Sequence, residues 1–183
     1  MLAIRRAHGF SLVELLVVIA VAAVLLGIAT SDLRSLVRHQ QLKAALSDLF
    51  GAIDLTRSQA ITRGMRVYLA PSGGGWSSGW TVFVDKDGDG IPGEADELIA
   101  VHGPIAEGIV ITSGFTSPWV PDYIAYNGGG RSCSHASSMA ARWGTLSLTL
   151  DGQTRRIKIN MLGRARACDP ARDGESCSGP ETP

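Results

Sequence analysis

The sequence predicts an α+β protein in which one long N-terminal α-helix packs on a C-terminal antiparallel β-sheet domain. From residue 10 to residue 29 the chain is almost entirely apolar, and helical periodicity then continues to Gly64. Beyond Gly64 the apolar residues alternate with polar ones, as they do in half-buried strands. Glycine-rich and Asp-Gly turns separate these alternating runs, which favours antiparallel pairing.

The apolar run holds only two strongly polar residues, Ser11 and Glu14. A helix of about 20 apolar residues crosses a bilayer core of about 30 Å. Residues 10–30 are therefore expected to form a transmembrane or filament-core helix. Arg5 and Arg6 precede the run, and they favour an orientation with the N-terminus in the cytoplasm.

The N-terminal motif resembles the signal of type IV pilins and type II secretion pseudopilins. It consists of a short basic leader, the junction Gly9-Phe10 and the sequence Ser-Leu-Val-Glu-Leu-Leu. The resemblance implies that a prepilin peptidase removes residues 1–9 and that Phe10 is N-methylated. It also implies that Glu14 pairs with the N-terminal amine of a neighbouring subunit. The protein would be a single-pass inner-membrane protein with a periplasmic C-terminal domain, and would later join other pilins in a pilus or pseudopilus at the cell surface.

Residues 31–64 are expected to continue the helix in amphipathic form, with one apolar stripe on the domain. A globular β domain is expected over residues 65–168 and an acidic tail over residues 169–183. The helix end, residues 55–64, leads straight into a strand, and this segment resembles the GspH/FimT group of minor pilins, closest to the FimT type. The alternation predicts strands at residues 65–70, 80–84, 98–102, 108–112, 123–126, 145–150 and 154–161.

An acidic hairpin is expected after the strand at residues 80–84. Its carboxylates follow the spacing of a twelve-residue calcium loop, with acids at loop positions one, three, five and twelve. Flanking strands, instead of helices, favour a plain turn, to which Asp and Gly are suited by conformation alone. We therefore expect no cofactor in the hairpin, and a bound calcium ion is the alternative. The four acids are Asp85, Asp87, Asp89 and Asp96.

The chain has three cysteines, all in its last third. A domain outside the cytoplasm would keep disulfides. Cys168 and Cys177 bracket a short polar loop and could close it, whereas a Cys133–Cys168 pair would tie the end of the chain to the domain body. The local pair is slightly favoured.

A basic stretch at residues 163–166 is the strongest functional signal. In an extended segment Arg164 and Arg166 project to the same side, roughly 6–7 Å apart, which approximates the phosphate spacing of one DNA strand. Gly163 before them would let the backbone approach a ligand closely. Such a patch would bind phosphates without sequence preference. The supporting bases are Arg155, Arg156 and Lys158, with Arg142 a further candidate.

The Gly-Arg-x-Arg stretch also resembles the DNA-binding motif of FimT-type minor pilins, which act in DNA uptake during natural transformation. This resemblance implies double-stranded DNA as a partner. The alternative is a GspH-like minor pseudopilin that primes or caps a type II secretion pseudopilus through protein contacts, without DNA. The sequence contains no catalytic set, and an enzyme is not expected. Aromatic residues could stack on bases, but cores and strand faces are their more common places. These residues are Trp76, Trp80, Trp119, Tyr123, Tyr126 and Trp143.

Overall fold

The computed structural model describes residues 10–179, and all of their side chains except those of residues 25–32. Its first element is one long helix, α1 (Leu12–Arg63). The Ser11 hydroxyl accepts the backbone N–H of Glu14 at 3.2 Å and caps the first turn. Gly64 follows the last turn with a φ of 65°, as helix-ending glycines do. The chain forms two compact units, residues 1–40 and 41–183, and their boundary falls inside α1.

In the first unit, large apolar side chains from Phe10 to Val24 are exposed along α1. Glu14 is exposed among them. Gly9 and the rest of the expected leader lie outside the described residues. A membrane crossing is expected from the sequence over residues 10–30; none of the helices in the described part of the chain has the length and apolar character that a crossing requires.

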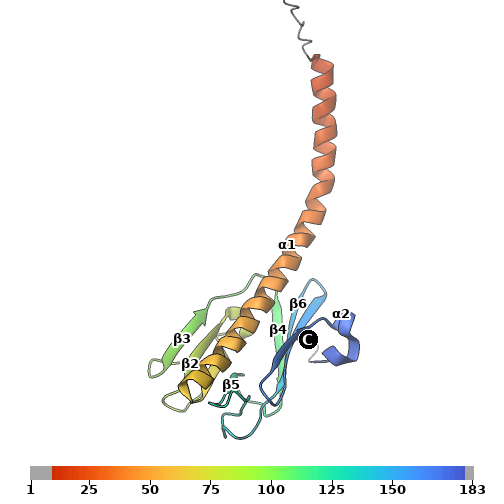
Figure 1. Cartoon of the computed structure of the whole chain (residues 1–183). Helices are drawn as coiled ribbons and strands as arrows, with labels where there is room; N and C mark the ends of the chain where they lie inside the picture. The colour runs from red at the N-terminus through yellow and green to blue at the C-terminus, as the bar shows by residue number, and fades with distance from the viewer. Residues whose placement is uncertain (1–9, 180–183) are drawn as a thin grey trace, which may run out of the picture. The chain divides into compact units, whose positions relative to one another are not determined.

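The second unit contains two antiparallel sheets of four strands each. The first has the strand order β3-β2-β1-β5, and the second has the order β4-β6-β7-β8. Figure 1 shows residues 41–63 of α1 running across both, with β2 and β3 on one side and β4 and β6 on the other. The strands of the first sheet are β1 (Val67–Pro71), β2 (Trp80–Val84), β3 (Glu97–His102) and β5 (Ile124–Tyr126). Those of the second are β4 (Val110–Phe115), β6 (Gly144–Leu150), β7 (Gln153–Ile159) and β8 (Ala165–Cys168).

The core of this unit lies where α1 meets the two sheets. Leu49 and Ile53 on α1 are completely buried, as are Leu69 on β1 and Ile157 on β7. They belong to one apolar cluster that draws on both sheets. Past residue 40, α1 therefore lays one apolar stripe on the β domain, as predicted. Leu33, Leu36 and Val37 were expected in the same stripe but are exposed.

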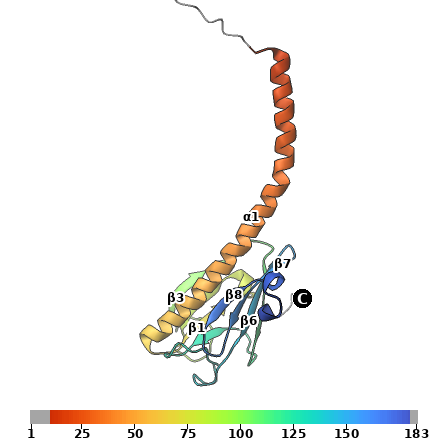
Figure 2. The same cartoon turned by 45° about the vertical axis from the view of Figure 1, so that its right-hand side comes forward.

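Seven expected strands are present with ends shifted by up to three residues, and the strand at residues 80–84 has the expected bounds. The hairpin between β6 and β7 turns at Asp151 and Gly152, both with positive φ, as a two-residue turn requires. β8 was not expected. Figure 2 shows it with β6 and β7. After β8 the expected polar tail instead forms two short helices, α2 (Pro170–Asp173) and η2 (Gly174–Cys177); a third short helix, η1 (Trp76–Ser78), precedes β2.

Candidate nucleic-acid interface

The outer face of β7 carries two of the predicted bases. Ile157 and Ile159 point into the core, so the alternating residues Arg156 and Lys158 face the other way. Arg155 alternates with Arg156 and so lies on the same face of the strand as Ile157. Its guanidinium forms an ion pair with Asp169 at 3.0 Å. Arg155 is therefore separate from the other bases, contrary to the expectation that it supports them.

β8 brings the predicted arginines to the same face. In the register of β7 and β8, Arg166 lies directly opposite Lys158, and opposed residues of antiparallel strands share a face. Arg164 sits just before β8, in the turn after β7, where its backbone N–H donates to the Asn160 side chain at 2.9 Å. Arg164 and Arg166 are both exposed. The Arg164 side chain makes no hydrogen bond or ion pair with any described residue.

The C-terminal segment folds back over this face. Cys168 and Cys177 form a disulfide, which is the local one of the two pairs considered, and Cys133 is free and buried. Three bases then donate hydrogen bonds to main-chain oxygens near Cys177: Arg156 to the Cys177 carbonyl at 2.6 Å, Arg166 to the Ser176 carbonyl at 2.6 Å, and Lys158 to the same oxygen at 3.3 Å. Carbonyl groups position these cations without neutralising their charge.

A groove of about 910 Å³ runs beside these bases. Strand ends of the second sheet form its floor, and the C-terminal segment forms one wall. Lys158, Arg164 and Arg166 give the groove a positive lining. Its other lining residues are Gly114, Trp143, Gly144, Thr145, Ile159, Asn160, Ala165, Ser176, Ser178 and Gly179.

Gly163 lies in a crowded part of the domain, and its place in a DNA-binding motif stays a prediction. It is buried, with a φ of 79°, and an added Cβ would lie 2.6 Å from the Gly130 carbonyl oxygen and 2.8 Å from the ring of Tyr126. Its close neighbours are thus parts of its own chain. The glycine permits the turn that leads from β7 to β8, and in that way it positions Arg164.

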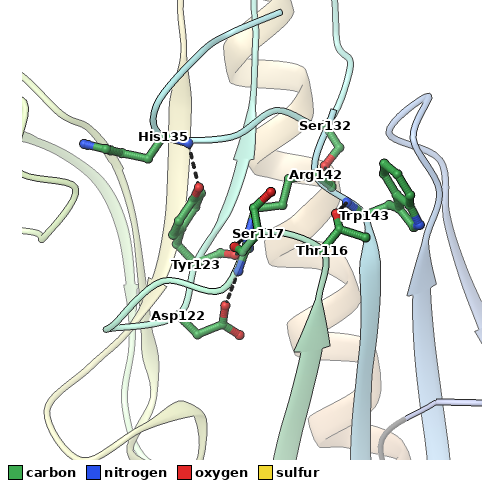
Figure 3. Close-up of polar contacts among 8 residues, drawn as sticks. All are labelled: Thr116, Ser117, Asp122, Tyr123, Ser132, His135, Arg142 and Trp143. Atoms are coloured by element: carbon green, nitrogen blue, oxygen red, sulfur yellow. Dashed lines mark hydrogen bonds and ion pairs between the residues drawn. The ribbon is translucent and has the colours of Figure 1, made fainter. Parts of the chain in front are cut away.

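Arg142, a further candidate for the basic patch, is buried and belongs to a separate cluster (Figure 3). Its guanidinium donates to the Ser117 carbonyl at 3.0 Å and to the Tyr123 carbonyl, and forms an ion pair with Asp122 at 2.5 Å. It also stacks over the rings of Tyr123 and Phe115. The cluster holds the segments on either side of it together, and phosphate cannot reach it.

The acidic hairpin brings three of its four acids together. Ligand oxygens of Asp85, Asp87 and Asp89 lie within 4.8 Å of one another, and Asp96 is outside this group. Asp85 accepts the backbone N–H groups of Gly88 at 2.7 Å and of Gly90 at 3.1 Å.

The carboxylates of the hairpin therefore have a conformational role. A backbone hydrogen bond from Asp89 lowers the pKa of Asp87. Desolvation and the nearby charges of Asp89, Asp96 and Asp85 oppose it, and the net pKa is raised. This arrangement fits a plain turn, and calcium stays a prediction.

Two parts of the groove were missed at the sequence level. Residues 165–168 alternate, but Ala-Arg-Ala-Cys has weak strand propensity, so β8 gave little local signal. Trp143 is 39 % exposed, unlike Trp76 and Trp80, which are buried in the core. Its position just before β6, next to a glycine, is the only sequence hint that it lies at a strand end.

Two family models match the chain. The model of type II transport protein GspH matches residues 45–163, which is more than half of the chain, and the prokaryotic N-terminal methylation motif matches residues 4–30. No curated protein matches the chain.

Solved structures share the fold. The minor pilin FimU of Pseudomonas aeruginosa is 15 % identical with a TM-score of 0.55, and the match covers 76 % of this chain and 97 % of FimU. The minor pseudopilin EpsH from the type 2 secretion system of Vibrio cholerae is 14 % identical with a TM-score of 0.49, over 72 % of this chain and 99 % of EpsH. The long N-terminal helix and the antiparallel sheets match the type IV pilin fold of FimU, and by its match to the family model the chain belongs to the GspH family.

Proposed function

We propose that this protein is a minor type IV pilin of the FimT type that binds double-stranded DNA without sequence preference during DNA uptake. The observation that supports this most directly is the row of cations on β7 and β8. The Arg164 side chain has no hydrogen bond or ion pair with a described residue, and the side chains of Arg166 and Lys158 donate only to neutral oxygens. Their positive charges are therefore available to phosphates.

Processing and assembly follow from the methylation motif and the family. A prepilin peptidase would cleave between Gly9 and Phe10, Phe10 would be N-methylated, and Glu14 would pair with the N-terminal amine of a neighbouring subunit. The helix would anchor the protein in the inner membrane, with the β domain in the periplasm, until it joins other pilins. Mass spectrometry of the mature N-terminus tests this: the expected species begins with methylated Phe10, and an intact leader would refute it.

DNA binding is tested with the compact unit that starts at Gln41. Fluorescence anisotropy with a labelled 20-base-pair duplex measures affinity at several salt concentrations. Each phosphate contact contributes about −0.9 to the slope of log K against log salt. The double variant Arg164→Ala, Arg166→Ala is expected to reduce the steepness of that slope by about 2.

Lys43→Ala is the matched control, since Lys43 is an exposed base on α1 away from the groove. It removes one positive charge, as Arg164→Ala does, and should change the affinity little. DNA binding through this face is wrong if Arg164→Ala and Lys43→Ala have equal effects, or if the double variant keeps the wild-type affinity and slope.

A structural role in a type II secretion pseudopilus is the second candidate. The observation that favours it is that Arg156, Lys158 and Arg166 all hold the C-terminal segment, so these bases also serve the fold of the chain itself. In that case the wild-type unit would not bind the duplex. It would instead form complexes with other minor pseudopilins, measurable by co-purification.

A further inference from the structure

The groove on the second sheet contains an exposed tryptophan as well as cations. Trp143 is 39 % exposed and lines the same groove as Lys158, Arg164 and Arg166. Figure 3 shows its ring pointing away from the Arg142 cluster. An exposed indole offers a flat apolar face on which another ring can stack. The same groove carries three cations, so a ligand that combines a flat ring with negative charge would suit it.

The structure holds Trp143 firmly in this position. Its backbone N–H donates to the Thr116 hydroxyl at 3.1 Å, and its carbonyl accepts the Thr116 N–H at 2.9 Å. The next residue, Gly144, begins β6, and a Cβ there would lie 2.2 Å from the Gly114 carbonyl oxygen. Only glycine fits at 144, and Gly114 also lines the groove. No side chain from these two positions covers the indole.

The dimensions of the groove favour one strand of nucleic acid. Its volume of about 910 Å³ falls within the range of small-ligand pockets, so the groove can take up a few nucleotides of a single strand, whereas a duplex would contact only its exposed cations. In a duplex the bases stack on one another and cannot reach a ring on the protein. In a single strand every base has a free face for an aromatic side chain, and a positive groove follows the backbone.

We propose that this groove binds single-stranded DNA, with one base stacked on Trp143 and neighbouring phosphates on Arg164 and Arg166. This rests on the proposed function, and it adds a class of ligand: a single strand, or the frayed end of a duplex, binds more tightly than the duplex interior. Arg164 and Arg166 supply the attraction that any DNA feels. Trp143 supplies the preference for unpaired bases.

The experiment compares three labelled ligands by anisotropy with the compact unit from Gln41 onward. They are a thymidine 12-mer, an abasic 12-mer with the same backbone, and a closed-end 12-base-pair duplex. Stacking of one base predicts that Trp143→Ala weakens binding of the thymidine 12-mer roughly fivefold or more. Binding of the abasic strand and of the duplex should change less than about twofold, because neither presents a base to the indole.

Two further variants separate stacking from folding. Trp119→Ala removes a tryptophan that is 40 % exposed but outside the groove, and it should leave all three affinities unchanged. Trp143→Phe keeps an aromatic ring, and should retain most of the single-strand affinity. The thymidine 12-mer should quench tryptophan emission in the wild type, and this quenching should be largely absent in Trp143→Phe.

The possible failures are distinguishable. If Arg164→Ala weakens all three ligands but Trp143→Ala leaves single-strand binding unchanged and Trp143→Phe leaves the quenching unchanged, single-strand binding on Trp143 is overturned and the proposed DNA function stands. If no ligand binds, or if Arg164→Ala has no effect, both are overturned. If Trp119→Ala lowers single-strand affinity as much as Trp143→Ala does, the stacking assignment is wrong.

Discussion

Replacing Gly163 by alanine is expected to destabilise the β domain strongly, although Gly163 belongs to a motif predicted to bind DNA. Its φ of 79° lies in the left-handed region, where an alanine costs about 1–2 kcal/mol. The stiffer unfolded chain offsets about 0.4–1 kcal/mol of this. The new Cβ would also lie 2.6 Å from the Gly130 carbonyl oxygen and 2.9 Å from the Ser132 backbone nitrogen. Forcing these groups apart costs about 1–3 kcal/mol.

The chain contains a matched control. Gly152 has a φ of 77°, but nothing lies within 4 Å of a Cβ added there. Gly152→Ala therefore carries only the conformational cost, about 1 kcal/mol after the offset from the unfolded chain. Gly163→Ala should cost roughly 2–4 kcal/mol in total.

Thermal unfolding of the unit from Gln41 onward, followed by circular dichroism, measures the difference. At about 2–4 °C of Tm for each kcal/mol, Gly152→Ala should lower Tm by about 3 °C and Gly163→Ala by roughly 5–15 °C. Equal shifts in the two variants would refute the close approach to Gly130. If Gly163→Ala lost DNA affinity while keeping its Tm, the glycine would be a ligand-binding position and not a structural one.

Three further outcomes are expected. Burial raises the pKa of Cys133 to about 11, so Ellman's reagent at pH 8 should react with no thiol in the native unit and with one after unfolding in guanidinium. The hydrogen bond and charge of Arg63 lower the pKa of Glu97, and this stabilisation is present above the ordinary Glu pKa and lost as pH falls through the lowered one. The Tm difference between wild type and Glu97→Gln should accordingly shrink between pH 7 and pH 3, and a constant difference would contradict the assignment. A calcium site in the hairpin predicts calorimetric heat in the wild type that Asp87→Ala, Asp89→Ala abolishes, whereas equal heats would leave a plain turn.

Local patterns in the sequence were sufficient for most of the fold. The apolar stripe of α1 and the alternation of the strands are short-range signals, and Asp151-Gly152 marks its own turn because both residues tolerate positive φ. β8 was not predicted because its four residues are mostly alanine and arginine, which give little strand signal. Backbone hydrogen bonds pair it with β7, and no apolar pattern in its sequence indicates this pairing.

The site shows the same division. Arg164, Arg166 and Lys158 were expected in one basic patch and line one groove. Arg155 was expected with them and Arg142 was a further candidate. Arg155 instead forms an ion pair with Asp169, and Arg142 is buried. The sequence shows which residues are charged. It does not show which of them form ion pairs, because the partner residue lies elsewhere in the chain.

The sequence by itself determined the N-terminal methylation motif, the long helix and the identity of the bases near the C-terminus, since each depends on residues close together in the chain. Only the tertiary structure decided what surrounds those bases. The pairing of β8 with β7 sets Arg166 opposite Lys158. The disulfide at Cys177 folds the C-terminal segment back to form one wall of the groove, and the start of β6 brings Trp143 into the same groove. These contacts join segments far apart in sequence, and they form only when the packing of the whole domain compensates the entropy lost on bringing them together.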